Sequence, residues 1–266
     1  MKSRGSSDAG ITRLSAPCFA LAKSAKPRVV CRAMNILALD TCFPALTVAI
    51  GRGVGTPEMR IVSRSEPMAT GHAERMLPLI GDLLRESETG MADIDRIAVT
   101  IGPGSFTGTR IGIAAARAFK LARGIPIVTF SSLEAMALSP LVAPMAGEDI
   151  AVAVDAHRGE AYVELFDGGT RRSLTPPRML PLTELASLPR GRPVIAVGTT
   201  ADRLVESVTT AGGTARVEPG VVFPDMAATV ARAGERQPAA GSVEPLYLRP
   251  PDAKPQEGKI LARAGA

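Results

Sequence analysis

The apolar positions of this chain form short runs of the strand type before they change to helical spacing. Runs at 35–40, 45–53 and 59–67 are separated by short turns and predict three strands in a meander. Residues 71–87 then follow helical spacing, with six apolar residues among the nine positions 76–84. That stripe is wider than a helix needs to cover one sheet, so we expect a further surface to cover its other side.

The next segment has the order strand, helix, strand. Residues 94–102 predict a buried strand, 107–123 a helix that ends at Gly124, and 125–130 another strand. Short connections between them imply a parallel crossover unit. Ser131 or Ser132 is then expected to cap a short helix.

A stretch rich in Pro and Gly at 139–149 indicates the boundary between two lobes. A hairpin that turns at 157–159, a strand at 192–198 and a helix capped by Asp225 are expected beyond it. The pattern therefore predicts an α/β protein with an N-terminal lobe over 34–138 and a C-terminal lobe over 139–266.

The formal net charge of +5 comes from the first 33 residues. They carry seven basic residues and one acid, which leaves 24 basic and 25 acidic residues from Met34 onward, out of totals of 31 and 26. This basic leader has the Ser, Ala and Arg content of an organellar transit peptide. We favour the alternative of a mis-assigned start or a disordered tail, because "MNILALDT" begins a strand at Met34 itself.

The remaining composition narrows the class of protein. A nearly neutral body with 3% aromatic residues does not favour direct RNA binding by stacking and phosphate contacts. The chain has no run of 18 apolar residues, and Cys42 is the one cysteine beyond the leader, so we expect a cytoplasmic protein without a membrane span.

The most unusual stretch is "TIGPGSFTGTRIG" at 100–112. It lacks the Lys-Ser/Thr pair of a P-loop and the GxGxxG spacing of a dinucleotide site. It still places backbone N–H groups and a helix N-terminus at the end of a strand, where anions bind. The alternative is a tight turn whose glycines let two backbones approach closely.

Asp40 and Thr41 lie at the end of the first strand, and they too could serve either a phosphate site or a local turn. Asp40 could accept from water on a nucleotide-bound Mg²⁺ and Thr41 could donate to a phosphate, or both could satisfy a local turn. Few other residues of the chain are candidates for catalysis or metal binding. A two-histidine metal site on the helix with His72 would need histidine at position 76, which is Met76, and His157 stands in a turn.

Small residues gather on the predicted helix 107–123. Such a surface lets another helix approach closely, and together with the broad apolar stripe of 71–87 it predicts that a partner binds these two helices.

Five segments together identify a family. "MNILALDT", "GHAERMLPLI", "TIGPGSFTGTRIGIAAARAFKLARGIPIVTFSSLEAMA", "VDAHRGEAYVELF" and "EPLYLRPPDA" resemble the TsaB family, also called YeaZ, of bacterial tRNA threonylcarbamoyladenosine synthesis. They follow in order over nearly all of 34–255. The leader departs from the family pattern, as does Cys42, which stands where many relatives have Ser.

The resemblance implies an actin-like ASKHA (ribonuclease H-like) fold with two lobes, each a mixed sheet flanked by helices. It implies a non-catalytic scaffold subunit of the tRNA N6-adenosine threonylcarbamoyltransferase complex, which forms threonylcarbamoyladenosine at position 37 of tRNAs reading ANN codons. The expected partners are a TsaD-like catalytic paralogue, in a heterodimer, and a TsaE-like ATPase. The chain would contact tRNA only through the complex and would need no metal, cofactor or catalytic residue of its own.

By the same resemblance, the partner surface comprises residues of both helices, namely His72, Met76, Leu79, Ile80, Leu83, Gly108, Gly112, Ala115, Ala116 and Phe119. A vestigial site at Asp40, Thr41 and Gly104 with weak ATP or ADP binding stays open, as does a homodimer. The alternative function is an independent enzyme of this fold, either an ATP-dependent phosphotransferase, for which Asp40 and Asp155 could supply the acids, or a metallopeptidase-like enzyme.

Overall fold

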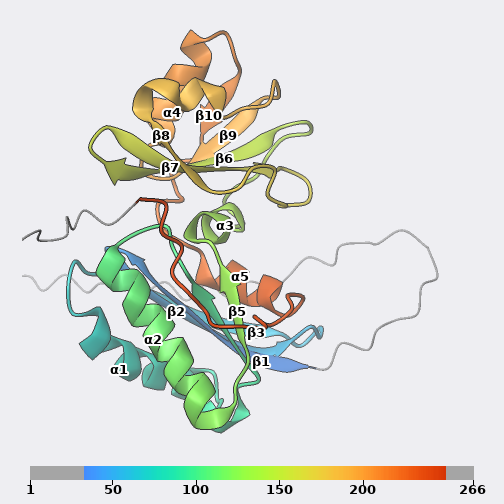
Figure 1. Cartoon of the computed structure of the whole chain (residues 1–266). Coiled ribbons are helices and arrows are strands. Elements are labelled where there is room, and N and C mark those ends of the chain that lie inside the picture. Colours follow the sequence, from blue (N-terminus) through green and yellow to red (C-terminus); the bar gives the residue numbers. More distant parts are fainter. Residues whose placement is uncertain (1–32, 250–266) are drawn as a thin grey trace, which may run out of the picture.

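The computed structural model describes residues 33–249, so the predictions for residues 1–32 and 250–266 lie outside the described residues. Two five-stranded sheets form the frame of the molecule (Figure 1). The first has the order β3-β2-β1-β4-β5, with β1 Met34–Phe43, β2 Ala45–Val54, β3 Arg60–Pro67, β4 Arg96–Thr100 and β5 Ile127–Phe130.

The second sheet repeats this arrangement. Its order is β10-β9-β6-β7-β8, with β6 Asp149–His157, β7 Glu160–Asp167, β8 Arg178–Pro181, β9 Val194–Val197 and β10 Ala215–Val217. In each sheet the first strand pairs antiparallel with the second and parallel with the fourth. Both sheets are therefore mixed, as the resemblance implied.

The helices cover the two faces of the first sheet unequally. α1 (His72–Glu86) and α2 (Phe106–Arg123) pack on one face, and α5 (Met226–Ala233) packs on the other (Figure 1). Alternate residues of β1 serve the two cores: Leu37 and Leu39 face α1 and α2, whereas Ile36 and Ala38 face α5. This explains why the residues "ILAL" at 36–39 are all apolar and do not alternate with polar ones.

The junction between the sheets is filled by α3 (Ser132–Ala137). Its Leu133 and Met136 pack in one core with Phe43 of β1 and Phe166 of β7. On the second sheet, α4 (Ala201–Thr210) and the 3-10 helix η2 (Leu182–Ser187) cover the outer face. A further short 3-10 helix, η1 (Met91–Asp93), precedes β4.

Most of the predicted elements are confirmed. The meander, both long helices and the hairpin lie where the pattern placed them, and Ser131 and Asp225 accept from the amides of Glu134 and Ala228 as helix N-caps. The sequence did not predict β8, β10 or α4. β10 has three half-buried residues, too few to show a period, and α4 buries only Ala201, Leu204 and Val208.

α5 bears on the expected division into lobes. Although it follows the second sheet in sequence, it packs on β1 and β2 of the first, and the backbone amide of Ala239 donates to Ile127 of β5. We therefore propose a division in which residues 34–138 and 226–247 share the first lobe and residues 139–225 form the second, which Arg249 contacts.

Candidate functional site

The glycine segment packs directly on the end of β1. A Cβ at Gly104 would collide with the backbone carbonyl of Cys42, and one at Gly108 would collide with that of Thr41. The amide of Ser105 donates to the Cys42 carbonyl at 2.7 Å. Only glycine permits an approach this close, so the spacing of the segment is explained by backbone packing.

Thr41 joins the two segments. Its hydroxyl donates to the carbonyl of Gly108 at 2.6 Å and accepts from the amide of Gly112 at 3.1 Å, and the residue is 1% exposed. Its hydrogen-bonding groups are therefore engaged inside the protein. The geometry favours the packing alternative over a phosphate donor, because a phosphate could reach Thr41 only by separating β1 from α2.

Asp40 lies in the same junction without any exposed surface. Its Oδ1 accepts from the hydroxyl of Thr100 at 2.5 Å and from the amide of Cys42 at 3.3 Å, whereas no described residue bonds its Oδ2. Burial raises the pKa of Asp40 to about 6, against the opposing effect of these hydrogen bonds. At neutral pH the protein therefore holds a buried carboxylate that is only partly satisfied.

The structure corrects the residues expected to face a partner. Eight of the ten are buried and belong to the protein's own packing, namely His72, Met76, Leu79, Ile80, Leu83, Gly108, Gly112 and Ala116. Ala115 and Phe119 are half-buried against the same core. The apolar stripe of α1 is therefore mostly core. It is wider than one sheet requires because α1 and α2 pack on the same face of the first sheet.

Other residues of these helices form the accessible surface. Leu77 is 62% exposed, Phe106 52% and Leu121 90%, and Tyr247 from the C-terminal segment stacks on Phe106. α2 also exposes four basic residues, Arg110, Arg117, Lys120 and Arg123. We call these apolar and basic residues together the outer face of α1 and α2. α2 contains no acidic residue, so this surface combines large apolar side chains with the positive charge of α2.

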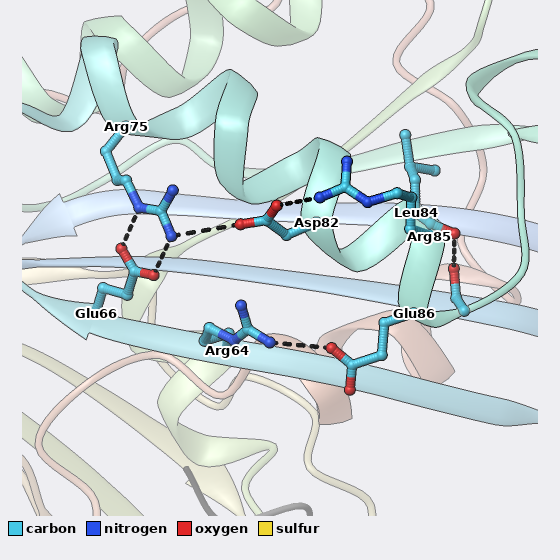
Figure 2. Close-up of polar contacts among 8 residues, drawn as sticks. Arg64, Glu66, Arg75, Asp82, Leu84, Arg85 and Glu86 are labelled. Carbon is cyan, nitrogen blue, oxygen red and sulfur yellow. Dashed lines mark hydrogen bonds and ion pairs between the residues drawn. The ribbon is translucent and has the colours of Figure 1, made fainter. Parts of the chain in front are cut away.

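Ion pairs hold one flank of α1 against β3 (Figure 2). Arg75 donates two hydrogen bonds to the Glu66 carboxylate, each 2.6 Å long, and lies 3.6 Å from Asp82. Arg64, two residues before Glu66 on β3, pairs with Glu86. The Arg75 guanidinium holds the pKa of Glu66 below its usual range. This polar flank fixes α1 against β3.

The two histidines lie in different environments. His72 is 7% exposed, and its Nε2 lies 3.3 Å from the carbonyl of Phe43. His157 projects from the β6–β7 hairpin, with its Nδ1 3.3 Å from Asp155. Within residues 33–249 no three His, Cys, Asp or Glu side chains are grouped as a metal site would require.

A buried carboxyl that sequence reasoning missed lies at the junction of the sheets. Glu164 of β7 is 3% exposed and accepts from the hydroxyl of Ser131, the residue that caps α3. Burial raises the pKa of Glu164 to about 7. Its position in "EAYVELF" gives no sign of this, since a glutamate in a strand normally faces solvent.

Known proteins match this arrangement. The family model described as TsaD, tRNA N6-adenosine threonylcarbamoyltransferase, matches residues 66–230. An uncharacterized protein of Mycobacterium tuberculosis is 33% identical over 221 residues, which is 83% of this chain and 94% of the relative. The chain belongs to the TsaD family.

Relatives that carry the TsaB name match between 48% and 62% of this chain. The "tRNA threonylcarbamoyladenosine biosynthesis protein TsaB" of Escherichia coli is 38% identical over 129 residues, 48% of this chain and 53% of that protein. The chain thus spans about half of the E. coli protein. In a separate alignment it spans 56% of an uncharacterized Mycobacterium leprae protein.

A solved structure of a YeaZ-like protein confirms the fold of this chain. The Pseudomonas aeruginosa structure titled as an uncharacterized protein with similarity to peptidase YEAZ has a TM-score of 0.67 and 27% identity, covering 81% of this chain and all of that one. The predicted ASKHA-type α/β fold and the TsaB resemblance are therefore both confirmed. In the described part of the chain, none of the helices has the length and apolar character to cross a bilayer.

Two glycines on neighbouring helices offer a matched test of the packing at Thr41. A Cβ at Gly112 would lie 2.6 Å from the bonded Thr41 hydroxyl, whereas one at Gly81 of α1 would meet only the tip of Arg85, at 3.9 Å. We expect Gly112→Ala to lower the free energy of unfolding by about 1–3 kcal/mol. Gly81→Ala should raise it by about 0.5–1 kcal/mol. Urea unfolding followed by circular dichroism measures both, and effects of the same sign would contradict the close approach.

The buried carboxyl of Asp40 predicts a pH-dependent effect. Its folded-state pKa of about 6 lies above the unfolded value of about 4, so its contribution to stability falls as the pH rises through this window. We expect Asp40→Asn to be more stable than the wild type at pH 7.5, by at most about 2–3 kcal/mol, with the gain vanishing near pH 4. Urea unfolding at both pH values measures the difference.

Asp155→Asn is the control for this comparison, because Asp155 is half exposed and should show no comparable gain. A less stable Asp40→Asn protein at pH 7.5 would contradict the prediction and would indicate that the Asp40 carboxylate binds a cationic group.

Proposed function

We propose that this chain is the non-catalytic scaffold subunit of a tRNA N6-adenosine threonylcarbamoyltransferase complex, required to form threonylcarbamoyladenosine at position 37 of tRNAs reading ANN codons. Its membership of the TsaD family and the TsaB names of its relatives support this role. The complex would act in the cytoplasm, and this chain would contact tRNA through its partners.

The observation that carries the proposal is the outer face of α1 and α2. Leu121 leaves 90% of its surface in solvent and Leu77 leaves 62%, on helices that are fixed to a well-packed sheet. Large apolar side chains grouped on one face of a soluble protein mark a protein interface. We infer that a TsaD-like catalytic subunit binds here as a heterodimer, and that the pair recruits a TsaE-like ATPase.

The junction at Asp40, Thr41 and Gly104 supports a scaffold rather than an independent enzyme. The Thr41 hydroxyl and the backbone around Gly104 are engaged in packing β1 against α2. An ATP phosphate would have to displace these contacts, so we infer that the subunit functions without its own nucleotide, metal or cofactor. Asp155, the second acid that a phosphotransferase would need, is paired with His157 on the hairpin.

Reconstitution tests the role of the chain. We expect tRNA threonylcarbamoylation by the TsaD-like, TsaE-like and remaining pathway enzymes to be lost when this chain is omitted, and we expect this chain alone to modify no tRNA. The assay measures incorporation of labelled threonine into tRNA. Steady ATP hydrolysis or tRNA-independent peptidase activity by the pure chain would instead support the enzyme alternative.

Paired variants test the interface. Leu77→Glu and Leu121→Glu place a charge where we infer a dry contact, and each should weaken binding of the TsaD-like subunit by about tenfold or more. Leu141→Glu is the control, since Leu141 is 56% exposed on the loop after α3 and lies outside this face. Titration calorimetry measures the affinities. Equal affinities for all three variants would contradict the proposed surface.

A further inference from the structure

The C-terminal segment 243–249, which includes the motif "LYLR", leaves the first lobe and ends on the second. Val243 is 4% exposed in the core beneath α1 and α2, and its carbonyl accepts from Arg117. The amide of Leu246 donates to Ile101 at 2.7 Å, directly before the glycine segment. In Figure 1 this segment, in dark red, continues from the first sheet toward the second. We call residues 243–249 the strap.

The strap is anchored on α2 by Tyr247. The Tyr247 ring stacks on Phe106 with centroids 5.3 Å apart, and its hydroxyl accepts from Arg110 at 2.7 Å. The Arg110 guanidinium lies over the Phe106 ring at 3.6 Å. A tyrosine, an arginine and a phenylalanine thus fasten the strap to the N-terminal turns of α2 through stacking and cation–π contacts.

Two residues later the strap reaches the β6–β7 hairpin. Arg249 donates to the carbonyl of Ala156 at 3.0 Å and forms an ion pair with Glu160. The hairpin between them holds His157 at φ 62° and Arg158 at φ 56°, left-handed conformations that cost energy in residues other than glycine. A charged donor on the carbonyl side of this turn stabilises a conformation that the turn residues alone do not favour.

We propose that the strap couples α2 to the β6–β7 hairpin, with Arg249 as the positioning residue that holds the turn and Tyr247 as its anchor. Two residues of extended chain span only about 7 Å, so Tyr247 cannot leave Phe106 without pulling on Arg249. Because Phe106, Arg110 and Tyr247 lie on the outer face of α1 and α2, a subunit bound there would also stabilise the hairpin. This last consequence rests on the proposed function, whereas the coupling within the chain does not.

Hydrogen exchange in the full chain tests the coupling without any partner. Arg249→Ala should speed amide exchange at residues 157–161 about tenfold, the effect of losing one hydrogen bond from a charged group. Tyr247→Ala should speed exchange at the same amides, although Tyr247 lies on the other lobe. Tyr247→Phe keeps the ring on Phe106 and should have a smaller effect. Unchanged exchange in β1 and β9 shows in each case that the fold is intact.

Arg203→Ala is the matched control, an exposed arginine of the second lobe whose pair with Glu206 lies within α4. Its hairpin should exchange as in the wild type. If Tyr247→Ala leaves the exchange of residues 157–161 unchanged, the proposed coupling is wrong, even where Arg249→Ala acts locally.

Adding the TsaD-like subunit to the wild type should slow exchange at the hairpin. Binding without that slowing would overturn the link to the partner, whereas absence of binding would count against the proposed function alone.

Discussion

The contact between the end of β1 and the first turns of α2 sets the position of every surface discussed above. The hydroxyl of Thr41 bonds the carbonyl of Gly108 and the amide of Gly112, and the glycines at 104 and 108 admit the carbonyls of β1. A helix held this close to its strand cannot shift or rotate without breaking buried hydrogen bonds, which are costly to leave unmade. The outer side of α2, with Phe106 and Leu121, is therefore presented in one orientation.

The same contact explains why the glycine segment resembles a phosphate loop although its backbone is engaged in packing on β1. Both uses require glycine and a helix N-terminus at the end of a strand. In a phosphate loop the backbone N–H groups point to the ligand, whereas here the amide of Ser105 donates to Cys42 and the amide of Gly112 to Thr41. The buried Asp40 beside them has no exposed surface.

The sequence was informative where a local pattern decides the structure. The apolar runs located β1 and β2, the helical period located α1 and α2, and capping residues located the starts of α3 and α5, because these features depend on neighbours within a few residues. It was misleading at Met76, Leu79 and Ala116. A hydrophobic stripe indicates that one side of a helix is shielded from water. It does not indicate whether the chain itself or a partner shields that side. The contact of Arg249 with Glu160 spans 89 residues, and no local pattern could indicate it.

Charge gives the outer face a preference for one kind of partner. α2 exposes Arg110, Arg117, Lys120 and Arg123 and contains no acidic residue to offset them. In a symmetric homodimer that placed α2 against its own copy, these cations would face one another, and like charges across an interface cost several kcal/mol. A partner helix with carboxylates beside an apolar stripe would instead neutralise the arginines and cover Leu77 and Leu121. From the distribution of charge on α2 we infer that a different, acidic subunit, and not a second copy of this chain, binds the outer face.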